Sequence, residues 1–458
     1  NLGAQHPFLD NKLSLISGEH VTDDSGTGCV HIAPAHGVED FELGKKNNLE
    51  VLNPIQSDGI FSGLPEELNG IHVYKLDEHI IEILVREKKL LSSNKFKHSY
   101  PHCWRTKTPL IYRATPQWFI SMQKNSLLEK TLKKIPEVHW IPAWGEARIE
   151  GMISQRPDWC ISRQRKWGVP ITLLINKKTG EPHSNSSIIF TRICKLVEEH
   201  GIEKWFDIDI EDLIDNPEDY EKVQDTLDVW FDSGSSHAAV LEKTANLKFP
   251  ADLYLEGSDQ HRGWFQSSLL TSIAVSNSIP YKSAMTHGFT VDGRGNKMSK
   301  SKGNVISPQK IIDRLGSDIL RLWVASTDSS TEMTVSDEIL NRTSDKYRKI
   351  RNTIRFLLSN LADYDPKQFS IKNISIELDK WVVIKAIDLQ KDIKRHYKEF
   401  NFHILTQLIH SFCVNELGSF YLDVIKDRQY TCKKDSLERQ SAQHSMFIVL
   451  KMLLTWIA

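Results

Sequence analysis

The sequence lacks paired cysteines, an excess of charge of one sign and long apolar runs. Its six cysteines are scattered and form no Cys-x-x-Cys pair, which argues against a complete zinc knuckle and favours a reducing compartment. Lys and Arg number 58 against 59 Asp and Glu, so any contact with nucleic acid must come from local basic patches. No apolar run approaches the roughly 18 residues that cross a bilayer. These absences predict a cytoplasmic protein without a membrane span.

Length and local pattern divide the chain. At 458 residues it is too long for one core and suggests about three domains. Short apolar runs with Gly and Asp fill residues 1–95, where we expect a strand over Cys29–Ala33 and a helix within 76–92. Residues 96–222 are rich in Trp, Pro and Arg. The chain begins without Met and stops inside a helical apolar pattern, so we expect both ends to be cuts.

An α/β pattern follows over 223–335, and helical patterns follow over 336–458. Two short strands are expected at Asp228–Phe231 and Asp252–Leu255, each leading into a polar turn and a helix. Ser307 followed by Pro308 predicts a helix start. Beyond residue 335 the apolar residues recur at helical spacing, first over 336–363, which indicates an α-helical domain.

The most informative segment is the loop Asp292–Asn304, with the string Lys-Met-Ser-Lys-Ser at 297–301. It is polar and glycine-rich and carries four cationic side chains. Lysine ammonium groups are compact point charges suited to phosphate. It is not a P-loop, since no G-x-x-x-x-G-K-[ST] string occurs. The alternative interpretation is a solvated basic turn.

Three more segments carry groups suited to substrate binding. Residues 255–265 follow a predicted strand, and their acidic and amide groups could hold an ammonium and a ribose, while Trp264 could wall an apolar pocket. The alternative there is a helix start capped by Ser258 or Asp259. Residues 159–171 combine cations and aromatics, or form an Arg-rich packed loop. Residues 225–235 read as a strand that runs into a polar turn.

These four segments, in this order, resemble the isoleucyl-tRNA synthetases, a family of class I aminoacyl-tRNA synthetases, over essentially the whole chain. The resemblance implies an α/β fold that comprises the second half of a Rossmann-like catalytic domain and part of an inserted β-rich editing domain, followed by a helical anticodon-binding domain. It assigns 1–95 to the editing domain, 96–222 to a region returning to the catalytic domain, 223–335 to that domain, and 336–458 to the anticodon-binding domain.

The resemblance also implies site residues. Lys297 and Lys300 are the expected catalytic residues, and the ATP phosphates are expected to contact Lys297, Ser299, Lys300 and Ser301. The aminoacyl-adenylate is expected to contact Glu256, Asp259, Gln260, Trp264 and Trp230. The helix after residue 336 is expected to bind tRNA through Arg342, Lys346, Lys349 and Arg351, of which the first three share one face. A solvated, salt-bridged face is the alternative, because acidic residues lie nearby.

Two histidines and two acids within 26–40 raise a metal site as one alternative. The spacing of His31 and His36 matches no recognised zinc framework, so no metal is expected. The resemblance implies that this string forms the editing pocket, where Asp40 is expected to bind the ammonium of mischarged valine and His31 to lie against the tRNA ribose. One methylene is worth only about 1–3 kcal/mol in an apolar pocket, a limit for which isoleucine and valine are themselves the usual example.

The implied activity joins isoleucine to tRNA(Ile) with ATP and Mg²⁺, in a monomer with no membrane contact. The family's His-Ile-Gly-His motif, threonine-rich editing strand and C-terminal zinc module are missing from this sequence, so we expect the chain alone to be inactive in adenylation and to lack that zinc. The alternatives are a valyl- or leucyl-tRNA synthetase, or a tRNA-binding or trans-editing module that makes no adenylate.

Overall fold

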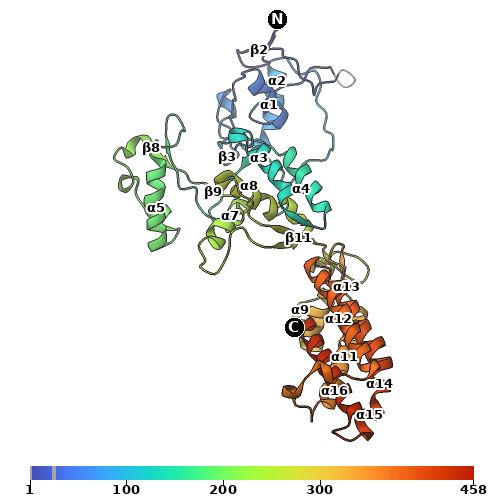
Figure 1. The fold of residues 1–458 in the computed structure, drawn as a ribbon. Helices are drawn as coiled ribbons and strands as arrows, with labels where there is room; N and C mark the ends of the chain where they lie inside the picture. The colour runs from blue at the N-terminus through green and yellow to red at the C-terminus, as the bar shows by residue number, and fades with distance from the viewer. Residues whose placement is uncertain (1–2, 23–26) are drawn as a thin grey trace. The chain divides into compact units, whose positions relative to one another are not determined.

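The computed structural model describes residues 3–22 and 27–458, apart from the side chain of Ser301. The chain divides into two compact units, Asn1–Trp118 and Phe119–Ala458 (Figure 1). We also expect a turn over residues 25–28, before Cys29, and residues 25 and 26 lie outside the described residues. Within the described residues, no helix is both long enough and apolar enough to span a membrane.

The first unit is built on a small apolar core. It contains one antiparallel hairpin, β1 (Gly3–Gln5) with β2 (Lys12–Ser14), and two helices, α1 (Val38–Lys46) and α2 (Leu76–Arg86). The apolar side of α2 packs into a cluster of buried residues: Ile55, Phe61, Leu68, Leu76 and Ile83. The helix expected within 76–92 is therefore present, because its apolar residues recur at helical spacing.

The strand expected over Cys29–Ala33 is wrong. These residues are irregular, and Val30 is more than half exposed. An extended segment becomes a strand only when its backbone groups pair with a neighbour, and no described segment pairs with this one.

The second unit contains a parallel sheet in the order β10-β11-β4. Strand β10 (Tyr254–Gly257) is followed by helix α8 (Trp264–Ser276) and then by β11 (Ser283–His287), which is a parallel βαβ unit. Strand β4 (His139–Ile141) pairs with the far side of β11. The strand expected at 252–255 is thus confirmed with a two-residue shift, and the fold is of the α/β class.

Helix α8 is buried along most of its length and carries hydroxyl groups as well as apolar side chains. Ser268 and Thr271 donate to the carbonyl of Gly234, at 3.2 and 2.8 Å, so the end of α7 (Val229–Gly234) is fastened to α8. A Cβ at Gly234 would lie 3.0 Å from the backbone of Ser267, so only glycine allows this approach.

The remaining elements of this unit surround the sheet or extend from it. The other strands form short pairs: β3 (Phe119–Ile120) with β5 (Trp159–Cys160), β6 (Ser162–Arg163) with β9 (Thr226–Leu227), β7 (Leu174–Asn176) with β8 (Tyr220–Lys222), and β12 (Thr290–Val291) with β13 (Met333–Thr334). The helices up to residue 326 are α3 (Leu127–Lys134), α4 (Trp144–Ser154), α5 (Ser186–His200), α6 (Lys204–Asp207), α9 (Pro308–Leu315) and α10 (Ser317–Ser326).

Residues beyond 336 are helical, as the apolar spacing predicts. The helices are α11 (Asp337–Asn360), α12 (Glu377–Lys398), α13 (Phe402–Ser411), a π-helical segment (Phe412–Tyr421), α14 (Leu422–Val424), α15 (Lys426–Thr431) and α16 (Leu437–Ile457). In Figure 1, α11, α12 and α16 lie side by side, and they share one apolar core. The start expected for α9 at Pro308 is also confirmed.

The carboxylate of Asp379, on α12, is fully buried inside this helical core. It accepts hydrogen bonds from the hydroxyls of Tyr421 (2.8 Å) and Ser441 (2.7 Å). The guanidinium of Arg428 adds two more, at 2.9 and 3.0 Å. Because buried charge is costly unless it is paired, this network ties α12 to α15, α16 and the π-helical segment in one arrangement.

Candidate functional site

Three of the five residues expected to hold the adenylate meet at Gly263. The Oε1 atom of Gln260 accepts a hydrogen bond from the backbone N of Trp264 at 3.0 Å. A Cβ at Gly263 would lie 2.3 Å from that Oε1 and 2.9 Å from Cη2 of Trp230. Glycine is therefore required at this position for space. Sequence reasoning missed Gly263, because nothing in its own segment shows that Trp230 approaches it.

The ring of Trp264 is held from two sides. It stacks on Tyr254 of β10 with a centroid distance of 3.9 Å and an interplanar angle of 10°. Its Nε1 donates to the carbonyl of Ser233 at 2.9 Å and to Oγ of Ser236 at 3.1 Å. The ring therefore joins the sheet to α7, and Trp230 nearby keeps 42 % of its surface exposed. Such a rigid aromatic pair can wall an apolar side chain.

The strand expected at Asp228–Phe231 is wrong, because Asp228 begins a helix instead. Its Oδ1 accepts from the backbone N of Trp230 at 3.3 Å, which caps α7. Its Oδ2 accepts from Nε1 of Trp159 at 3.1 Å and pairs with Arg163 at 2.9 Å. Asp228 thus links the 159–171 segment to Trp230, a role that the sequence analysis missed.

Glu256 and Asp259 lie at the carboxyl end of β10. Glu256 is opposite Thr286 in the register of β11. Asp259 is exposed, and its Oδ2 accepts from Nε2 of Gln260 at 3.2 Å. The alternative of a helix start capped by Ser258 or Asp259 is not found, because residues 258–262 form a 3-10 turn after Gly257 and α8 begins at Trp264. Two carboxylates and one amide therefore gather at the edge of the sheet where substrates bind in such folds.

Strand β11 leads directly into the lysine loop through Gly288. A Cβ at Gly288 would lie only 2.0 Å from the carbonyl oxygen of Thr331, so the chain can pass there only without a side chain. Strand β12 then pairs in parallel with β13. Within the loop, Met298 packs against an apolar cluster that includes Trp323 and Met333, and Ile306, just beyond the loop, packs against the same cluster.

The loop presents its lysines on an ordered frame. The Nζ of Lys297 lies 4.6 Å from the ring centroid of Phe289, a cation–π distance. Lys300 is exposed and begins a short turn, in which Oγ of Ser299 accepts from the backbone N of Lys302 at 3.3 Å. The side chain of Ser301 lies outside the described part. Within the described residues, no ion pair joins Lys297 or Lys300 to Glu256 or Asp259, so the two groups of candidate residues are not in direct contact.

The expected editing residues lie in the first unit. Asp40 is in the first turn of α1, where its Oδ2 accepts from the backbone N of Ala33 at 2.9 Å. His31 is exposed, two residues before Ala33. The Nδ1 atom of His36 lies 2.9 Å from the carbonyl oxygen of Tyr112. Within the described residues, no group of three or more metal-ligating side chains is assembled.

The expected tRNA-binding residues lie on α11, and all four are exposed. Arg342 pairs with Glu338 at 2.6 Å, as the salt-bridged alternative predicts. Lys346 and Lys349 face α13, where burial and then these two charges lower the pKa of His410. Arg351 does not share their face, because nine residues from Arg342 make about two and a half turns at roughly 3.6 residues per turn.

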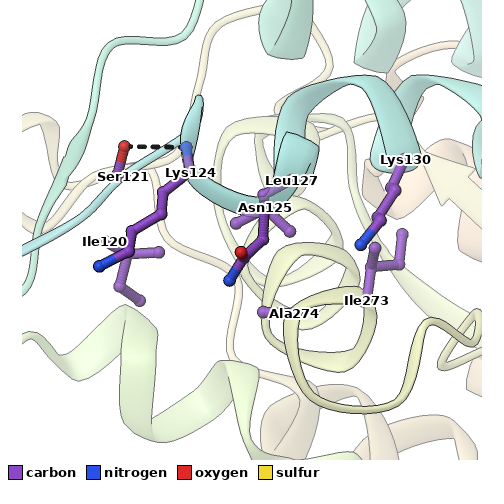
Figure 2. A pocket seen from close by; sticks show the side chains of 8 residues that line it. All are labelled: Ile120, Ser121, Lys124, Asn125, Leu127, Lys130, Ile273 and Ala274. Atoms are coloured by element: carbon purple, nitrogen blue, oxygen red, sulfur yellow. Dashed lines mark hydrogen bonds between the residues drawn. The ribbon is translucent and has the colours of Figure 1, made fainter.

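A pocket of about 200 Å³ lies at the other end of α8 from Trp264 (Figure 2). Ile273 and Ala274 of α8 form one side, Asn125 and Lys130 extend toward them from the opposite segment, and Lys124 extends toward Ile120. None of the expected site residues lines this pocket, so the candidate site is the edge of the sheet and not this cavity.

Comparison with known proteins agrees with this architecture. Residues 21–336 match the family model described as tRNA synthetases class I (I, L, M and V), and residues 379–458 match the anticodon-binding domain of tRNA ligase. Isoleucine–tRNA ligase of Marinomonas sp. is 55 % identical over 455 residues, and that of Pseudoalteromonas atlantica is 54 % identical over 460. These alignments cover 99 % and 100 % of this chain but 48 % and 49 % of the relatives, so the chain spans about half their length.

A solved structure supports the fold. Methionyl-tRNA synthetase of Mycobacterium tuberculosis, in complex with methionyl-adenylate, is 18 % identical and superposes with a TM-score of 0.53 over 78 % of this chain and 62 % of that one. The family match covers more than half of the chain. The chain therefore belongs to the class I tRNA synthetases of the isoleucine, leucine, methionine and valine group.

Proposed function

We propose that this chain belongs to an isoleucine–tRNA ligase, which activates isoleucine with ATP and Mg²⁺ and then transfers it to tRNA(Ile). The observation that carries the proposal is the loop 292–304, which Met298 anchors to an apolar cluster and which presents Lys297 and Lys300. The identity of more than 50 % to isoleucine–tRNA ligases over nearly the whole chain favours isoleucine over valine or leucine. A tRNA-binding or editing module without adenylation would have no use for such a loop.

In this proposal, catalysis rests on orientation and on charge, not on a covalent intermediate with a side chain. The carboxylates of Glu256 and Asp259 hold the amino acid and adenylate. Trp264 and Trp230 wall the side-chain pocket. Lys297 and Lys300 meet the negative charge that grows on the pyrophosphate as it leaves.

The direct test uses a complete synthetase that contains this chain. It should support isoleucine-dependent exchange of pyrophosphate into ATP and should charge tRNA(Ile). Valine should be activated more weakly, by a factor of about 10–200, as one methylene allows. Exchange that depends on leucine, or a preference for valine, would assign the chain to a leucyl- or valyl-tRNA synthetase. Binding of tRNA without any exchange would favour a tRNA-binding or editing module that makes no adenylate.

The editing assignment predicts a separable defect at Asp40. In a complete synthetase, Asp40→Ala should leave isoleucine activation intact while valyl-tRNA accumulates, because a carboxylate facing a substrate ammonium makes a charge-assisted contact. Deacylation of purified valyl-tRNA measures the effect. The parental deacylation rate in the variant would show that Asp40 is not the anchor.

Two further variants make this test specific. Asp40→Asn keeps an oxygen that can accept from the Ala33 N–H but removes the charge, so it should show the same defect if charge is what matters. Glu39→Ala removes an exposed carboxylate from the same helical turn and should leave deacylation unchanged.

The α11 surface predicts salt-dependent binding of tRNA. Changing Arg342, Lys346 and Lys349 together to Gln should raise the dissociation constant. The slope of log K against log salt should fall by about 1 for each phosphate that the variant no longer neutralises. Adenylation should be spared. Filter binding or fluorescence titration at several salt concentrations measures both quantities.

The same helix offers a matched control. Arg348, Arg351 and Arg355 are equally exposed but lie on another side of α11, so neutralising them should change affinity less. Equal effects of the two triple variants on tRNA affinity would mean that only the overall charge of α11 matters. If the variant of Arg342, Lys346 and Lys349 binds tRNA as the parent does, their face of α11 is only a solvated surface.

A further inference from the structure

Asp292 carries a negative charge inside the most cationic loop of the chain. Four cationic side chains lie within the next ten residues: Arg294, Lys297, Lys300 and Lys302. Even so, the carboxylate of Asp292 forms no ion pair with them in the described structure, although the backbone brings it close to one. Val291 pairs across the loop with Lys297, and the backbone N of Asp292 bonds to the carbonyl of Asn296 at 2.9 Å.

Neutral donors occupy this carboxylate instead. Its Oδ1 accepts from the backbone N of Arg294 and of Asn296, both at 2.9 Å. Its Oδ2 accepts from Nδ2 of Asn304 at 2.9 Å. These bonds, that of Asn304 foremost, lower the pKa of Asp292 to about 2, so it stays charged.

Asn304 also connects to the lysine string itself. Its Oδ1 accepts from the backbone N of Ser299 at 2.9 Å, and its Nδ2 lies 3.4 Å from the carbonyl of Lys297. One amide side chain therefore joins the first acidic residue of the loop to the backbone between the two lysines. The amide is half-buried, and a neutral group of this kind can occupy a carboxylate without adding a charge of its own.

We propose that Asn304 is a positioning residue that occupies the Asp292 carboxylate and thereby leaves Lys297 and Lys300 unpaired for the phosphates of ATP. This role goes beyond the proposed phosphate contacts but rests on them. A free carboxylate beside the strand position of Lys297 would compete with phosphate for the same ammonium groups, since both are anions within hydrogen-bonding reach. The amide removes that competitor while it holds the loop closed.

The test is a double-mutant cycle in a complete synthetase that contains this chain, read by single-turnover adenylation. Asn304→Ala should lower the rate by roughly 10-fold or more, the scale of one hydrogen bond to a charged group. Adding Asp292→Asn to that variant should restore much of the rate, because the freed competitor is no longer charged, while its Oδ1 still accepts from Arg294 and Asn296. Asp292→Asn alone completes the cycle.

A purely structural role makes the opposite forecast. If Asn304 only shapes the loop, the double variant will be as slow as Asn304→Ala or slower, and that result overturns the proposal, as does a parental rate in Asn304→Ala. Isoleucine binding, measured separately by equilibrium titration, should not move in any of these variants. Lys300→Ala in the same assay distinguishes failure of the proposed phosphate contact from failure of the Asn304 role. If Lys300→Ala has no effect on the rate, the phosphate contact itself is wrong. If Lys300→Ala is slow but the double variant does not recover, only the role of Asn304 is rejected.

Discussion

Replacing Lys300 by alanine in a complete synthetase should lower the rate of adenylation by about 10²–10³-fold while isoleucine binding stays nearly unchanged. Lys300 is exposed at the start of a short turn, two residues after Met298, which packs against an apolar cluster. Its ammonium is therefore presented to a ligand without being used in the fold. Charge on the pyrophosphate grows as it leaves, so the lysine binds the transition state most strongly, and its removal affects the rate more than binding.

Rapid-quench measurement of isoleucyl-adenylate gives this rate directly. Lys310→Ala provides the matched control, since Lys310 is an exposed lysine on α9 outside the loop, and it should leave the rate within experimental error of the parent. If Lys300→Ala forms the adenylate at the parental single-turnover rate, Lys300 has no role in the reaction.

Replacing Asp379 by alanine should destabilise the helical region by about 3–5 kcal/mol, because breaking a buried pair leaves the partner charge uncompensated. The side chain of Arg428 is only 16 % exposed and that of Asp379 is not exposed at all, so water cannot take the place of the carboxylate. The hydroxyls of Tyr421 and Ser441 are left without their acceptor at the same time. Hydrogen exchange of amides in α12 and α16 should therefore accelerate by a factor of more than about 100.

Asp388, on the same helix, is an exposed carboxylate and serves as the control for the stability effect. Asp388 pairs with Lys391 at 2.9 Å, but both side chains are more than half exposed. Asp388→Ala should cost less than about 1 kcal/mol, the usual worth of a surface pair. Equal exchange rates in the two variants would contradict a structural role for the buried network.

Regular patterns predicted the helices well and the short strands poorly. Helices α11 and α12 follow from apolar residues at helical spacing, because that spacing alone decides which side is buried. The string at 228–231 has the apolar content of a strand, yet Asp228 caps a helix there. Whether such a residue pairs in a sheet or caps a helix depends on donors from Trp159 and Arg163, which are about seventy residues away.

Function followed mainly from local strings, since four segments and their order are sufficient for a family resemblance. The residues that arrange the candidate site were less visible. Gly263 and Gly288 matter because of what approaches them, namely Trp230 with Gln260 in one case and Thr331 in the other. No property of glycine within its own segment reveals such a neighbour.

The sequence by itself determined the class of the fold and the helical region, and it predicted which lysines bind phosphate, because periodicity and charge are properties of neighbouring residues. Only the tertiary structure decided that Asp379 is buried with Arg428 and that Asn304 reaches Asp292. Each of these depends on which groups meet in space, and a hydrogen bond or a buried charge acts over only a few ångströms.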